Sequence, residues 1–283
     1  MISKRIYKVI PLLLVADILI WIGVYDLSKP QLLEVCFFDV GQGDSIFIET
    51  PQRHQILIDG GPDSGVVEKL SREMPFFDKS IDLLILTHPE HDHMRGLIDV
   101  LDSFDVENIL WTGVLKDSSE YKEWKRRIQE EGSRVIIAKR GQYIRLGDVF
   151  LFVLWPEESV EDKKVKNINN TSVVSRLVFG KISFLFEGDV YRSVEKKLLL
   201  REKNLKSTVL KVAHHGSKSS TDEEFLKAVL PEVAVIEVGK DNPYGHPHQE
   251  TLEKLEKYGM KILRTDIEGD IKIFSDGLNY KIK

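Results

Sequence analysis

The stretch "SIDLLILTHPEHDHMRG" (residues 80–96) joins a run of apolar residues to a dense group of polar ones. The apolar run predicts a buried strand, because it is short and rich in leucine and isoleucine. Directly after it, His88, Glu90, Asp92 and His93 place four possible metal-binding groups within six residues. Folding alone does not require such a group. A buried strand that delivers polar ligands at its end is typical of a rigid binding site.

The length and the cysteine content limit the class of protein and the kind of metal site. With 283 residues, of which 42% are hydrophobic, the chain is long enough for one large domain with a full core. Its single cysteine, Cys36, excludes a disulfide framework and a zinc site made of thiolates. Any bound metal ion must therefore be held by imidazole and carboxylate groups.

The first 28 residues differ in composition from the rest of the chain. Three basic residues precede an apolar run of about 17 residues, close to the shortest length that spans the hydrocarbon layer. We expect an uncleaved membrane anchor over residues 6–27, with the globular part, residues 29–283, outside the cytoplasm. Asp17 within the run argues against a lipid span. A cleaved signal segment of a secreted protein and a buried core helix are the alternatives.

The net charge argues against a broad surface for nucleic acid. The chain carries −5, and the three bases and two acids of the first 28 residues leave −6 for the remainder. An acidic surface repels the phosphate backbone. Basic runs such as "YKEWKRR" (121–127) and "DKKVK" (162–166) fit solvated helix or loop faces. The sequence therefore offers no broad electrostatic platform for nucleic acid.

Beyond the N-terminal segment, short strand-like runs alternate with helical stretches. Apolar runs bounded by glycine, such as "HQILIDGG" and "KISFLFEGDV", predict strands. Helices are expected over residues 64–74, 117–131, 191–203, 222–229 and 248–258. Many strands with helices between and outside them indicate a layered α/β protein.

Seven of the eight histidines fall into three short segments, and only His54, to which we assign no role, lies elsewhere. Random placement would not concentrate histidines after predicted strands. The three groups are His88, His91 and His93; His214 and His215; and His246 and His248.

A site of imidazoles and carboxylates without cysteine suits Zn²⁺ or Mn²⁺. Two such ions, about 3.5 to 4 Å apart, can share a hydroxide and clamp an attacked phosphoryl or carbonyl oxygen. That arrangement needs a bridging carboxylate. Asp189, which follows the apolar strand "KISFLFEGD", is the candidate.

The motifs "THPEHDH", "FEGD" and "VAHHGS" together resemble the metallo-β-lactamase fold superfamily, whose first motif is HxHxDH. The segments "FFDVGQGDSIFIE", "ILIDGG", "NNTSVVSRLVFG", "LKVAHHGSKSS" and "NPYGHPHQETLEKL" extend this resemblance to the hydrolase domain of the ComEC/Rec2 competence proteins. The matching segments run from about residue 33 to residue 265. The resemblance implies a four-layer αββα sandwich and two divalent metal ions, Zn²⁺ or Mn²⁺.

The resemblance also implies roles for individual residues. Asp189 is expected to bridge the ions, His215 to complete the second site, and His214 to compete with His215 as a ligand. Glu90 departs from the second histidine of the superfamily motif, and in the ComEC/Rec2 proteins this position is usually an acid. The complete set of implied metal ligands is His88, Glu90, Asp92, His93, Asp189, His215 and the competing His214.

Further residues are assigned roles near this site. No histidine occurs from residue 94 to 213, so Asn170 stands where the superfamily has another ligand. His246 resembles a family position that faces the site and could protonate a leaving oxygen. Asp59 fits equally an orienting partner of a histidine or a turn cap. The same two roles are open for Asp44, with the turn favoured, and an exposed position is favoured for His91.

The resemblance favours a metal-dependent phosphodiesterase or nuclease, with Asp92, His246 and Asn170 as catalytic residues and single-stranded DNA as substrate. A hydrolase of another ester or amide, similar to a phosphorylcholine esterase or an acyl hydrolase, is the second hypothesis. A non-catalytic metal-binding module is the third. No partner protein is inferred.

Overall fold

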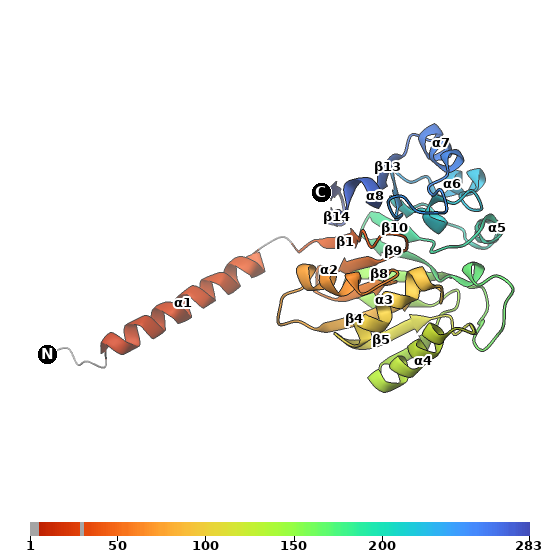
Figure 1. Cartoon of the computed structure of the whole chain (residues 1–283). Helices are drawn as coiled ribbons and strands as arrows, with labels where there is room; N and C mark the ends of the chain where they lie inside the picture. The colour runs from red at the N-terminus through yellow and green to blue at the C-terminus, as the bar shows by residue number, and fades with distance from the viewer. Residues whose placement is uncertain (1–5, 29–30) are drawn as a thin grey trace. The chain divides into compact units, whose positions relative to one another are not determined.

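The computed structural model describes residues 6–28 and 31–283 and divides into two units, residues 1–31 and 32–283 (Figure 1). In the first unit, α1 (Ile6–Ser28) is a helix whose described apolar side chains are exposed, such as Leu12 at 70%. Among the described residues, no helix is long and apolar enough to cross a membrane. The expectation of a membrane-spanning anchor over residues 6–27 is therefore not supported.

The second unit contains two sheets, the first of eight strands. Its strands lie in the order β15-β14-β1-β2-β3-β4-β5-β6. Neighbours from β15 to β3 pair antiparallel, and those from β3 to β6 pair parallel. The strands are β1 (Leu33–Phe37), β2 (Ile46–Glu49), β3 (Gln55–Ile58), β4 (Ser80–Leu86), β5 (Asp105–Trp111), β6 (Arg134–Ile137), β14 (Ile271–Ser275) and β15 (Tyr280–Ile282).

The second sheet has seven strands in the order β13-β12-β11-β10-β9-β8-β7. Its β10 to β13 pair parallel, whereas β7 to β10 pair antiparallel. The strands are β7 (Tyr143–Leu146), β8 (Val149–Trp155), β9 (Val174–Phe179), β10 (Ile182–Phe186), β11 (Val209–Lys211), β12 (Val233–Ile236) and β13 (Lys261–Arg264).

Apolar side chains form three clusters between four layers of secondary structure. One cluster, with Phe37 and Phe184, lies between the two sheets. A second packs the first sheet against helices that include Leu97 and Trp124, and a third packs the second sheet against helices that include Leu198 and Phe225. The expected αββα sandwich is confirmed. The helices are α2 (Gly65–Glu73), α3 (His91–Leu101), α4 (Ser119–Glu131), α5 (Arg192–Arg201), α6 (Glu223–Val229), α7 (Gln249–Lys257) and α8 (Thr265–Glu268).

The parallel strands position the chemistry. Three of the polar segments singled out above directly follow the carboxyl end of a strand: β4 leads to His88, β10 to Asp189 and β11 to His215. Side chains placed beyond the ends of packed strands are held by a rigid scaffold while remaining free to contact a ligand. The candidate site therefore lies at this edge of both sheets.

Candidate metal centre

The first half of the centre lies where β4 ends and α3 begins. β4 ends at Leu86, His88 follows two residues later, and α3 starts at His91. Asp92 and His93 lie in the first turn of α3, where the helix dipole favours a negative charge. His88 and His93 are buried, with ring centroids 4.2 Å apart. One short segment thus brings three polar side chains together.

Glycines allow neighbouring loops to approach this segment closely. A Cβ atom on Gly43, whose φ is 143°, would lie 2.1 Å from the carbonyl oxygen of Asp92. A Cβ atom on Gly96 would lie 1.9 Å from the carbonyl oxygen of Gly60. The Gly60 N–H donates to the carbonyl oxygen of His93 over 2.8 Å. These contacts fix the start of α3 against the loops after β1 and β3.

The hydrogen bonds of Asp59 determine which nitrogen of each histidine is free. His93 Nδ1 lies 2.8 Å from Asp59 Oδ2, and since the carboxylate accepts, Nδ1 carries the proton. Thr87 Oγ1 donates to the same oxygen over 2.6 Å and therefore accepts from His88 Nδ1, 3.0 Å away. In their neutral forms, both rings therefore keep the lone pair on Nε2. Asp59 also accepts from Thr87 N, which is distant in the chain, so its bonds fit the orienting role rather than a turn cap.

The second half of the centre comes from the second sheet. Asp189 follows β10 after Gly188, and His214 and His215 lie in the 3-10 turn Ala213–Gly216 after β11. Both histidines have left-handed backbones, with φ of 52° and 53°, which residues with side chains seldom adopt. His215 Nδ1 donates to the carbonyl oxygen of Glu237 over 2.9 Å, so in the neutral ring Nε2 carries the lone pair.

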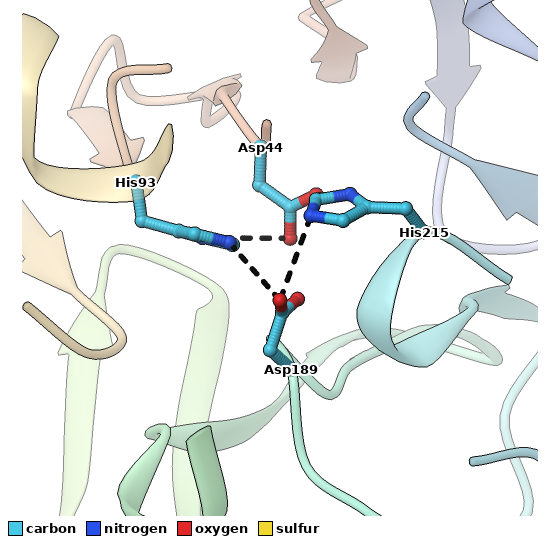
Figure 2. A group of neighbouring side chains, drawn as sticks. All are labelled: Asp44, His93, Asp189 and His215. Atoms are coloured by element: carbon cyan, nitrogen blue, oxygen red, sulfur yellow. Dashed lines mark ion pairs between the residues drawn. The ribbon is translucent and has the colours of Figure 1, made fainter. Parts of the chain in front are cut away.

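The two halves meet around Asp189. Its Oδ2 lies 3.4 Å from His93 Nε2 and 3.5 Å from His215 Nε2. Asp92 Oδ2 lies 3.3 Å from the same nitrogen of His215. Figure 2 shows the side chains of Asp44, His93, Asp189 and His215 converging from separate segments. Ligand atoms of these four residues lie within 4.8 Å of one another.

His214 is the more open of the two adjacent histidines. Its Nε2 lies 3.8 Å from Asp189 Oδ2, and its side chain is 20% exposed, compared with 2% for His215. His214 Nδ1 lies 3.2 Å from Ser219 Oγ, and the ring stacks on Tyr191 with centroids 5.3 Å apart. The geometry therefore places both histidines near the shared carboxylate, with His215 the deeper one.

Several buried atoms at this point lack the hydrogen bond that burial normally demands. In the described part of the chain, no hydrogen-bond partner is found for Nε2 of His88, His93 and His215, or for Oδ1 of Asp189. Buried polar atoms are almost always paired, because an unpaired one costs about 1–3 kcal/mol. Neutral imidazoles that turn Nε2 toward a shared carboxylate, as His93 and His215 can toward Asp189, fit a divalent cation.

A buried ion pair supports the second half from behind, and the sequence analysis did not identify it. Lys211 Nζ and Asp44 Oδ2 form an ion pair between fully buried side chains, and Asp44 Oδ1 lies 3.2 Å from His215 Nδ1. One Asp44 oxygen thus contacts a lysine and the other a histidine, so Asp44 orients His215 rather than forming only a turn. The available signal was a lysine within the apolar run "STVLKVA".

The carboxylates set the electrostatics of the centre. Burial lowers the pKa of His88 to about 3, assisted by the charge of His93. Burial also opposes a charge on His215, but Asp189 and Asp44 outweigh it and raise its pKa to about 10. The pKa of Asp189 is held well below its usual value, because the neighbouring imidazoles overcome the burial that would raise it. The local field favours positive charge, which a divalent cation supplies.

Three residues from the sequence analysis lie outside this cluster. Glu90 is half-exposed and forms an ion pair with Lys116 over 2.6 Å. His91 is exposed and bonds Glu120. Asn170 Oδ1 accepts from Tyr191 N over 2.9 Å, and Asn170 Nδ2 donates to Ser193 Oγ over 3.3 Å. The structure does not bring Glu90 or Asn170 to the metal ligands.

His246 lies against the histidines of the second half. Its ring centroid is 5.5 Å from that of His214 and 6.3 Å from that of His215. Among the described residues, no partner is found for its buried Nδ1. Burial and the positive charge of His215 lower its pKa to about 4. The ring therefore borders the cluster without a bond that commits its Nδ1 elsewhere.

Comparison with known proteins agrees with this geometry. The profile of the "Metallo-beta-lactamase superfamily" matches residues 38–239. The chain belongs to this superfamily. It is also similar to "ComE operon protein 3" of Bacillus subtilis (strain 168), at 34% identity over 84% of this chain and 32% of that protein. "Competence protein ComA" of Neisseria gonorrhoeae is 31% identical over 84% of this chain and 32% of that protein.

These relatives confirm the ComEC/Rec2-like assignment, and the chain spans about a third of their length. The structure of Igni18, a metallo hydrolase from Ignicoccus hospitalis KIN4/I, superposes with a TM-score of 0.55. The alignment covers 84% of this chain and 98% of Igni18 at 16% identity, and it supports the fold alone. The chain is thus a superfamily member with an Asp/His cluster suited to a divalent metal ion.

Proposed function

We propose that this protein is a metal-dependent phosphodiesterase that hydrolyses DNA. The observation that carries the proposal is the convergence of two unpartnered Nε2 atoms, from His93 and His215, on the carboxylate of Asp189, with the unpartnered His88 ring against His93. The names of the relatives, two competence proteins, support DNA as the substrate class. Because this chain spans only a third of those proteins, the proposal concerns the hydrolytic step and not DNA uptake.

Two metal positions are supported by different sets of side chains. His93, Asp92, Asp189 and His215 would hold one divalent ion, either Zn²⁺ or Mn²⁺. Asp189 would also face a second position, together with His88 and His214, which has fewer ligands because Glu90 and Asn170 bond elsewhere. When bound, such ions polarise a phosphoryl oxygen and lower the pKa of water.

The remaining residues orient these groups and handle a proton. Asp59 and Glu237 fix the Nδ1–H tautomers that leave each Nε2 available. His246, whose ring borders His214, would hold a proton for the leaving oxygen of the diester.

The test is a substrate panel with the full chain, supplied with Mn²⁺ or Zn²⁺. The panel contains single-stranded DNA, RNA, bis-p-nitrophenyl phosphate, p-nitrophenyl phosphorylcholine and a β-lactam. We expect metal-dependent hydrolysis of the DNA and of the simple diester. Turnover of only the phosphorylcholine ester or the lactam would replace the proposal with another hydrolase, and metal binding without any turnover would indicate a binding module.

A further inference from the structure

The outer face of the second sheet carries a row of aromatic and basic side chains far from the metal ligands in sequence. Tyr143 of β7 pairs with Phe152 of β8, which pairs with Arg176 of β9. The next row pairs the exposed Arg145 with Phe150. Tyr143 is 64% exposed and Phe152 is 36% exposed. None of these side chains belongs to the three apolar clusters formed by the described residues.

The aromatic rings form one continuous surface. The ring centroids of Tyr143 and Phe152 are 6.2 Å apart, and those of Phe150 and Phe152 are 6.3 Å apart with planes 17° from parallel. Arg145 lies over the Phe150 ring at 5.6 Å. Exposed aromatic rings seldom gather on one face of a sheet unless something covers them. We define Tyr143, Arg145, Phe150 and Phe152 as the aromatic face.

A basic cavity of about 460 Å³ adjoins the aromatic face at Phe152. Arg140, Arg176, Arg201 and Lys203 line it, with one carboxylate, Glu202, which Arg140 already contacts. Arg201 pairs with Glu157. Within residues 6–28 and 31–283, no carboxylate forms an ion pair with Arg176, Arg145 or Lys203; Arg176 bonds hydroxyl groups and a carbonyl instead. Three cations without a carboxylate partner therefore lie close together, although residues 29–283 carry a net negative charge.

We propose that the aromatic face and the adjoining basic cavity form a binding surface for single-stranded nucleic acid. Arg145 and Lys203 would contact phosphates, while Tyr143 and Phe152 would stack on bases. Aromatic platforms beside cationic grooves are the usual means of holding single strands, because every base has a π-face that only an unpaired strand exposes. A protein partner would also bury the rings, but the uncompensated cations are complementary to a polyanion.

The surface is connected to the metal centre. Phe152 lies three residues before Trp155 on β8, a distance of about 10 Å along an extended strand. The indole N–H of Trp155 donates to the carbonyl oxygen of Asn170 over 2.8 Å, and Asn170 holds Tyr191, which stacks on His214. A strand bound to the aromatic face would therefore lead toward the centre. This inference rests on the proposed function and names the surface that would hold its substrate.

The first test measures binding without chemistry. The full chain is titrated into fluorescein-labelled dT20 in EDTA, and anisotropy gives the affinity. We expect Phe152→Ala and Tyr143→Ala each to weaken binding by roughly 5- to 100-fold, the range for loss of one base–aromatic stack. Phe76→Ala, at a 90% exposed aromatic elsewhere, is the matched control and should bind as wild type does. If Phe152→Ala unfolds, Phe152→Leu removes the π-face while keeping the apolar volume.

The second test addresses the cations and separates this inference from the proposed function. The variant Arg145→Gln/Lys203→Gln should reduce the slope of log affinity against log salt by about 1.4, because each phosphate contact on a single strand contributes about 0.7. Lys261→Gln, on β13, is the control. Hydrolysis of bis-p-nitrophenyl phosphate should be unchanged in all these variants, because that small diester does not reach the aromatic face.

Several results would overturn the proposal. These are no binding of dT20, equal binding of wild type and aromatic variants, or equally tight binding of a 20-base-pair duplex. Self-association that requires Phe152 would assign the face to a second copy of the chain instead. If the wild-type protein binds dT20 but does not hydrolyse the diester with either metal ion, the proposed function is wrong and the binding surface is retained.

Discussion

The two halves of the metal centre are built in different ways. The first half takes His88, Asp92 and His93 from six consecutive residues, and the Nδ1 atoms of its histidines are tied directly or through Thr87 to Asp59. The second half takes Asp189 and His215 from the ends of two strands, supported by a backbone carbonyl and a buried ion pair. A contiguous motif can be read from sequence, whereas support that spans 167 residues, as between Asp44 and Lys211, cannot.

The largest expected effect is loss of one acidic ligand from either half. Asp92→Ala and Asp189→Ala should each reduce hydrolysis of bis-p-nitrophenyl phosphate by more than the roughly 10- to 100-fold typical of an outer-shell change. The measurement is initial rate with Mn²⁺ or Zn²⁺, together with the metal content of each purified variant. Asp117→Ala, at a 90% exposed carboxylate, is the control. Full activity in both ligand variants would rule out the proposed centre.

The buried ion pair behind the second half gives the next largest effect. Lys211→Met leaves Asp44 as an uncompensated buried charge, which should lower the free energy of unfolding by about 3–5 kcal/mol. The double variant Lys211→Met/Asp44→Asn removes both charges and should recover part of that loss. Urea unfolding monitored by circular dichroism measures both. A single variant as stable as wild type would show that the pair does not support this half.

Prediction from sequence succeeded where the signal was local. The helices expected over residues 64–74, 117–131 and 222–229 are present as α2, α4 and α6, because their boundaries are marked by capping and apolar spacing. The helix α3 was not predicted, although Met94, Leu97 and Ile98 have helical spacing, because the preceding polar cluster resembles a loop. The orienting role of Asp44 was ranked below a turn, since its partners are supplied by the second sheet.

The metal affinity of the first half should depend on a single carboxylate, Asp59, which orients both of its histidines. Asp59→Asn removes the carboxylate that orients His93 and, through Thr87, His88. We expect metal affinity to fall roughly 10- to 100-fold, measured by competition with a chelator. Asp82→Asn is a matched control, because Asp82 makes a similar 2.9 Å bond to His54 away from the centre. His215 should depend less on a single side chain, because its Nδ1 bonds a backbone carbonyl in addition to contacting Asp44.

The smallest expected effect concerns Glu90, which stands where the superfamily motif has histidine. Its carboxylate is bonded to Lys116 at the N-cap of α3, and the two side chains are 35% and 19% exposed. Partly exposed ion pairs of this kind contribute up to about 1 kcal/mol. Glu90→Gln should therefore change diester hydrolysis by less than about fivefold.

The choice of metal ion decides whether Glu90 belongs to the ligands. If it stays with Lys116, Glu90→His should show the same preference between Mn²⁺ and Zn²⁺ as wild type. A shift toward Zn²⁺ in Glu90→His, absent from the control Lys116→Met, would mean that the carboxylate turns from the lysine to bind the ion, since exchanging a hard oxygen for an imidazole nitrogen favours Zn²⁺. In that case the first half would supply four ligands from its six residues. Glu90 would then add a ligand to the second metal position, which Asp189, His88 and His214 otherwise share.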